Sequence, residues 1–171
     1  MRRTASTLTA LLALVLCLPG QTPPKMQVQS DLLQLMRGVL YPASNVVFSA
    51  QSDDPGDAKP APGQDPSMST DPLTSTFGGW QAVESASLAL AESTNLLLMP
   101  GRSCANGVPV PIADPDWQTF VQELRDASLQ AFKAAQSRDQ DAMIEVSGTM
   151  TEACAHCHRK WREKRPADRC K

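Results

Sequence analysis

Apolar residues recur at alternating steps of four and three along the first long amphipathic stretch of the chain. These positions are Leu32, Met36, Val39, Ala43, Val46 and Ala50. Such spacing puts the side chains on one face, so a helix is predicted over 25–50. Pro42 lies inside this stretch, and its ring would press on the carbonyl of Gly38. We therefore expect a kink there, or a helix that breaks and restarts.

A second helix is predicted from its start and stop signals. Asp71-Pro72 is typical of a helix start, and Pro100-Gly101 is typical of a helix end. The helix is therefore expected over 72–99. Gly78-Gly79 weakens its first turns, so the true start could lie near 79.

The third and fourth helices follow each other closely. Asp114-Pro115 repeats the start signal, and the third helix is expected to end near Ser137. The fourth is expected to begin around Asp139 and to stop before Pro166. Its apolar positions are again separated by steps of three or four, and they are Met143, Val146, Met150, Cys154, Cys157 and Trp161.

The segment between the first two helices differs in composition from the rest. Residues 51–71 are rich in proline, glycine, aspartate and serine, and they cannot bury a core. We interpret them as a long flexible loop. Four amphipathic helices with short later links predict an all-α fold, an antiparallel four-helix bundle. The low aromatic content of 5% also favours helices over a β-sandwich.

The N-terminus resembles an export signal. Arg2 and Arg3 form a basic start, an apolar run covers 8–18, and Pro19-Gly20 follows. We therefore predict a signal peptide over 1–20, a mature domain over 21–171 and a periplasmic location. The apolar run is too short for a comfortable membrane span. Membrane association through an uncleaved signal or a lipidated Cys17 stays open, although the preceding Leu16 is not the small residue that lipidation prefers.

The chemistry is concentrated in Cys154-Ala155-His156-Cys157-His158. This spacing is the attachment signal for c-type haem, because each thiol can form a thioether with a haem vinyl group. His158 then supplies the proximal nitrogen ligand of the iron. His156, between the cysteines, is expected to face solvent. A redox dithiol would open a helix after a strand, and a zinc site would bring a second ligand pair; neither pattern is found.

The haem motif and its surroundings resemble those of the class II c-type cytochromes, the cytochrome c′-type four-helix bundles. Cys154, Cys157, His158, Trp161 and Arg162 match the family pattern of a haem motif in the last helix, followed by an aromatic residue and an arginine. The resemblance covers about 25–165, and only the haem motif is specific. The chain departs from the family in its long acidic loop and in lacking the Arg-Gln pair often found early in the first helix.

Met36 is the candidate for the sixth iron ligand. In an antiparallel bundle the end of the fourth helix lies beside the start of the first. His158 is about 10 Å from the end of its helix, which corresponds to a depth near 33–36 in the first helix. Relatives with a methionine there are low-spin and six-coordinate. Met36 could instead be a core residue, and Met26 is a weaker candidate at the helix end.

Three further features are expected at the haem end. The loop over 100–114 should lie there, so Arg102 could pair with a haem propionate or remain a solvated charge. Trp161 should pack against the haem edge. Cys104 and Cys170 should also meet at this end, where an oxidising compartment would allow a disulfide between them.

The predicted function is electron transfer by an exported monohaem c-type cytochrome. The alternative is a five-coordinate, cytochrome c′-like protein that binds or senses a gas through an open distal site. No catalytic constellation is found, since a peroxidase would want a polar distal histidine or arginine. Redox proteins are the expected partners. The basic C-terminal tail suits docking of an acidic redox partner, or its cations merely offset the negative end of the helix dipole. The net charge of −2 gives no bias toward nucleic acid, and a homodimer stays open.

Overall fold

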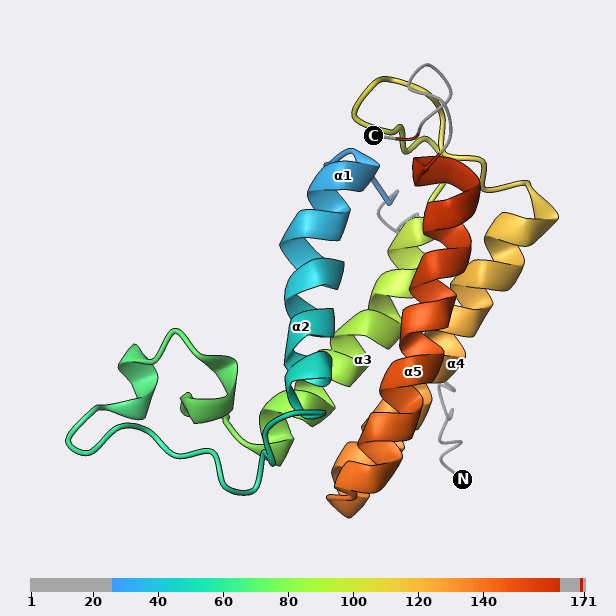
Figure 1. The fold of residues 1–171 in the computed structure, drawn as a ribbon. Coiled ribbons are helices and arrows are strands. Elements are labelled where there is room, and N and C mark those ends of the chain that lie inside the picture. The colour runs from blue at the N-terminus through green and yellow to red at the C-terminus, as the bar shows by residue number, and fades with distance from the viewer. Residues whose placement is uncertain (1–25, 164–169, 171) are drawn as a thin grey trace, which may run out of the picture.

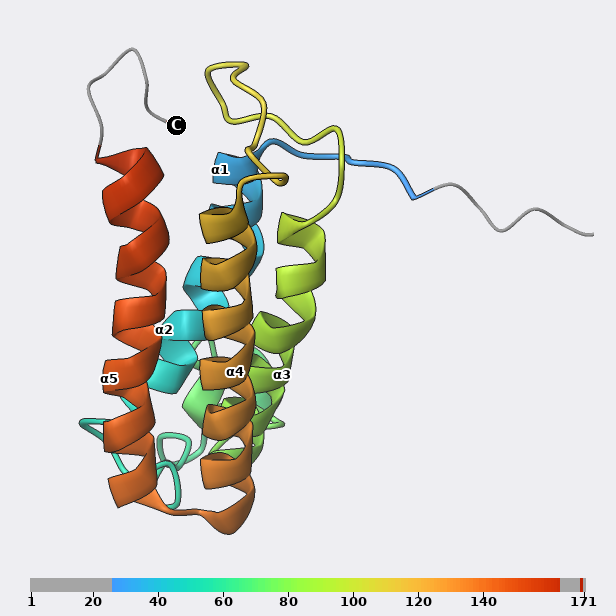
Figure 2. The ribbon, with the colours of Figure 1, turned by 90° about the vertical axis from the view of Figure 1, so that its right-hand side faces the viewer.

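The computed structural model describes residues 26–163 and 170. This part of the chain is mostly helical and contains no strand, apart from one isolated bridge between Ser103 and Pro109. Its four helical segments lie side by side in two perpendicular views (Figures 1 and 2). The prediction of an all-α fold is confirmed. The signal peptide, Cys17 and the stop at Pro166 lie outside the described residues.

The first helical segment begins at Leu32, and the predicted start at 25 is wrong. It comprises α1 (Leu32–Leu35), the π turn η1 (Met36–Leu40) and α2 (Tyr41–Ser49). Asp31 sets the start through a capping box. Its side chain accepts a hydrogen bond from the backbone N–H of Gln34, whose side chain accepts one from the N–H of Asp31.

The segment stays helical through Pro42. The N–H of Tyr41 donates to the carbonyl of Met36, five residues earlier, so the turn just before the proline is widened. Pro42 has no N–H to give to the α-helical ladder. The chain accommodates it with this π turn and not with the break that we considered.

The second helix, α3, spans Trp80–Leu97, so the predicted start at 72 is wrong and the later start near 79 is confirmed. Asp71 does cap a turn, but it is only the short 3-10 turn η3 (Pro72–Thr74). Gly79 then takes a φ of 60°, which favours glycine. Its N–H donates to the carbonyl of Leu73, and the chain folds back before α3 begins.

The last two helices begin where predicted, and the first of them also ends where predicted. They are α4 (Pro115–Ser137) and α5 (Gln140–Cys157), and α5 continues as a second π turn, η4 (His158–Arg162). Asp114 and Asp139 cap their first turns by accepting hydrogen bonds from backbone N–H groups. Arg138, in the left-handed conformation, makes the tight link between them.

The helices pack unevenly around the core. α4 lies between α3 and α5, and its fully buried alanines allow close approach: Ala127, Ala131 and Ala135. α2 packs on α3. The first segment reaches α5 near Gln140, whose side chain donates to the carbonyl of Ala50 at 3.3 Å. At the other end of the molecule, α1 and η4 are separated (Figure 1). Residues of both elements line a cavity there.

Candidate functional site

An apolar cavity of about 290 Å³ lies between the first helical segment and the C-terminal part of α5 with η4. Its volume is close to the lower end of the roughly 300–1,000 Å³ of cofactor pockets. The exposed residues of its lining, Arg37, Tyr41 and Arg162, mark its mouth. The walls come from all four helical segments and include Leu33, Leu40, Leu90, Leu97, Val121 and Leu124.

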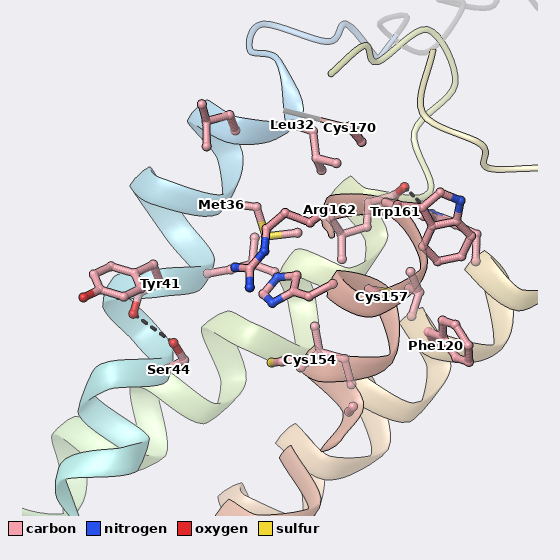
Figure 3. Close-up of a pocket in the computed structure, with 18 of the residues that line it drawn as sticks. Leu32, Met36, Tyr41, Ser44, Phe120, Cys154, Cys157, Trp161, Arg162 and Cys170 are labelled. Atoms are coloured by element: carbon pink, nitrogen blue, oxygen red, sulfur yellow. Dashed lines mark hydrogen bonds between the residues drawn. The ribbon is translucent and has the colours of Figure 1, made fainter. Parts of the chain in front are cut away.

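Both cysteines of the motif line this cavity as free thiols. The sulfur of Cys154 points from α5 towards α2 (Figure 3). Burial raises the pKa of Cys154, and it raises the pKa of Cys157 to about 12, with smaller contributions from Cys154 and Glu123. The two side chains, three residues apart on one helix, therefore present protonated sulfur atoms to the same apolar space.

His158 follows them on the same wall and is the first residue of η4. Burial lowers the pKa of its imidazole, and the nearby guanidinium of Arg162 lowers it further. The ring is therefore neutral at pH 7 and keeps a lone pair, which is the form that ligates a metal. Within the described residues, no group hydrogen-bonds this imidazole.

Met36 lies across the cavity, as the first residue of η1. Its sulfur points from η1 towards α5 (Figure 3). The structure therefore brings together Cys154, Cys157, His158 and Met36, which the sequence analysis had singled out. Met26 is 79% exposed and is not part of the lining.

Trp161 closes the cavity on the α4 side. It is buried, and its ring meets those of Trp117 and Phe120 edge-on, with centroids 5.0 and 5.8 Å away. Trp161 also contributes to the cavity lining, where a cofactor ring would find an aromatic wall. Packing of Trp161 against a haem edge stays a prediction.

Arg102 lies at the same end of the molecule but not in the cavity lining. It is 5% exposed, and its Nη1 donates to the carbonyl and the hydroxyl of Ser30 at 2.6 and 3.0 Å. Its Nε donates to the carbonyl of Leu96 at 3.3 Å. The guanidinium therefore ties the start of the first helical segment to the end of α3. The structure does not bring it to the place where a propionate contact was expected.

Cys104 and Cys170 meet as expected and form the disulfide that the sequence left open, with their Cα atoms 5.1 Å apart. Cys104 is buried in the loop after α3. Cys170 lines the cavity, and its N–H donates to the carbonyl of Trp161 at 3.1 Å. The bond therefore fixes this residue of the C-terminal tail beside the candidate site.

His156 makes contacts that the sequence analysis missed. Its Nδ1 lies 2.6 Å from a carboxylate oxygen of Glu123, and its ring lies 5.2 Å from that of Phe120. It is half-buried and does not line the cavity. Both partners belong to α4, and no spacing in the sequence places them beside the motif.

Comparisons of the chain with protein-family models, with curated proteins and with solved structures find no match. None of the helices in the described part of the chain has the length and hydropathy that a membrane span requires. Within the same residues, no three His, Cys, Asp or Glu side chains gather as a metal site.

Proposed function

We propose that this protein is an exported monohaem c-type cytochrome that carries electrons, folded as an antiparallel four-helix bundle of the class II kind. The observation that carries the proposal is the apolar cavity lined by Cys154, Cys157, His158 and Met36. Two free thiols, a neutral imidazole and a facing thioether are the groups that attach and ligate a c-type haem. The arrangement of these residues also fits a haem, since the cavity walls around them are apolar.

Each of these residues has a separate task. Cys154 and Cys157 would hold the haem covalently through thioethers. His158 would supply its imidazole from η4 and Met36 its thioether from η1, and a methionine ligand raises the reduction potential. The bound haem supplies an iron that takes up and releases one electron. The apolar side chains around it exclude water.

The partner of such a carrier is another redox protein, and the location is the periplasm. Two of the basic residues near the C-terminus do not single out an acidic partner, because they are paired within the protein. Lys160 is already paired with Asp114 and Asp116 at 3.1 and 2.6 Å, and Arg159 is paired with Glu152 at 3.3 Å. We propose no catalytic role for these residues and no nucleic acid partner.

Covalent attachment is tested first. The full chain is produced with a c-type maturation system, denatured, and separated by electrophoresis with haem staining. We expect the stain to remain with the protein, and the pyridine haemochrome spectrum to report one haem per chain. Cys157→Ser should leave a single thioether and shift the haemochrome band. A wild-type chain that carries no covalent haem would refute the proposal.

The sixth ligand is tested by the spectrum of the reduced protein with and without carbon monoxide. We expect a low-spin spectrum that ignores the gas, and Met36→Ala should turn it into a high-spin, gas-binding one. Met143→Ala is the matched control, because Met143 is fully buried but does not line the cavity. It should lose about 2–5 kcal/mol of stability and keep the wild-type spectrum. A wild-type protein that binds the gas at once would replace electron transfer by the five-coordinate alternative.

A further inference from the structure

Two arginines stand at the mouth of the cavity. Arg37 comes from η1 and Arg162 from η4, so they approach it from opposite walls, and both are exposed. The side chain of Arg162 extends from η4 across the cavity towards Met36 (Figure 3). The residues that line the cavity include these two cations and no aspartate or glutamate. The mouth is therefore positively charged, while the walls below it are apolar.

Within the part of the chain that the structure describes, the charges of these arginines are nearly uncompensated. Arg37 has no ion pair with any described residue. Among the same residues, Arg162 reaches only its neighbour Glu163, at 3.5 Å, with side chains that are 60% and 55% exposed. An exposed pair of this kind contributes little. Arg159, Lys160 and Arg102, at the same end of the molecule, have closer partners. Of the described cations that line the cavity, Arg37 and Arg162 are therefore free to bind an anion.

An apolar cavity below two cations fits a ligand with an apolar body and two carboxylates on one edge. Haem is such a ligand, because its two propionates lie on the edge opposite its vinyl groups. We propose that Arg37 and Arg162 each bind one haem propionate, which fixes the carboxylate edge at the mouth. This inference rests on the proposed function, since it needs the haem in this cavity. It assigns the propionates to residues other than the Arg-Gln pair that the chain lacks and other than Arg102.

The arrangement has an electrostatic consequence for the iron. A propionate that lacks its arginine is an uncompensated negative charge near the iron, and it stabilises the oxidised, more positive state. Removing either arginine should therefore lower the reduction potential. Replacing it by lysine keeps the charge and should largely restore the potential, although lysine cannot form the two parallel hydrogen bonds of a guanidinium.

The test measures the midpoint potential of the haem-loaded protein at neutral pH by spectroelectrochemistry. Arg37→Gln and Arg162→Gln should each lower the potential, the double variant should lower it further, and the two lysine variants should recover most of the loss. Arg159→Gln is the matched control: it removes the same charge from the same helix end, outside the cavity lining, and should shift the potential less.

The outcomes separate the two proposals. Wild-type protein without covalent haem overturns the proposed function, and this inference with it. Haem-loaded glutamine variants whose potentials match that of Arg159→Gln overturn the propionate assignment alone. If a glutamine variant fails to bind haem, the corresponding lysine variant decides: wild-type haem content and potential support the assignment, and failure to restore them overturns it.

Discussion

The disulfide between Cys104 and Cys170 should account for a large part of the stability of the fold. The bonded residues are 66 positions apart, and the loop between them contains α4 and α5. Closing a loop of this length removes unfolded-state entropy that corresponds to about 4 kcal/mol at 25 °C. Most small proteins are stable by only about 5–15 kcal/mol. We therefore expect Cys104→Ala with Cys170→Ala to lower the free energy of unfolding by about 4 kcal/mol.

The double variant is the right perturbation, because a single one would leave a thiol near the haem-attachment residues. Cys170 lines the same cavity as Cys154 and Cys157, so an unpaired Cys170 could form a wrong disulfide before haem is attached. Alanine at both positions avoids that outcome. It also avoids placing a hydroxyl group at position 104, which is 1% exposed.

Urea denaturation followed by far-UV circular dichroism measures the effect on the haem-loaded proteins. The entropic account makes a second prediction: without the bond, the unfolded chain exposes more surface, so the denaturant dependence should steepen. A variant within about 1 kcal/mol of wild type, with an unchanged slope, would show that the bond does not constrain the unfolded chain as reasoned. The visible spectrum of the protein with its haem reduced should be unchanged, since neither cysteine is proposed to bind haem or iron.

Two further predictions concern the ends of helices. Asp114→Asn keeps a capping side chain but loses the charge beside Lys160, whose hydrogen bond is the main reason why the pKa of Asp114 is lowered. A carboxyl group whose pKa is lowered in the folded state contributes stability at pH values above its ordinary pKa of 3.8. The variant should therefore be less stable than wild type at neutral pH, and this difference should disappear as the pH falls. A difference in thermal unfolding that persists in acid would contradict the ion pair. Gly79→Ala should destabilise by about 1–2 kcal/mol, because its φ is 60° and a Cβ would lie 2.9 Å from the carbonyl oxygen of Pro55. Gly148 lies in α5, and no atom lies within 4 Å of the Cβ that alanine would add there. Gly148→Ala should therefore raise the free energy of unfolding by roughly 0.5–1 kcal/mol. Equal effects of the two substitutions in denaturant titrations would refute this account.

The hydrophobic period predicted which stretches are helical, but local capping decided where two of them begin. The first helix was predicted to start at 25, although its apolar pattern begins only at Leu32, and the capping box of Asp31 with Gln34 places the start there. Asp71 offered a start signal that a 3-10 turn uses equally well. The conformation of Gly79, which a side-chain pattern cannot encode, then delays the helix to Trp80.

The candidate site was predictable as far as it depends on the spacing of residues in the sequence and on their depth along the helices. The spacing of Cys154 and Cys157 puts both on one face of a helix, and counting residues from the end of that helix located Met36. The partners of Arg102 and His156 were not predictable. A guanidinium that can face solvent or a backbone carbonyl is directed by the path of its loop, and that path depends on the whole packed structure.

The two π turns give the candidate ligands an unusual dependence on chain length. Met36 and His158 are each the first residue of such a turn, and a π turn holds about one residue more than the α turn it replaces. Each turn is therefore equivalent to a single-residue insertion. A regular α-helix through the same residues would rotate Met36 by about 100° relative to α2, whereas deleting one residue from 37–40 would keep its orientation in a regular α-helix. The facing position of the methionine thus depends both on the number of residues that separate it from α2 and on the π turn that accommodates them.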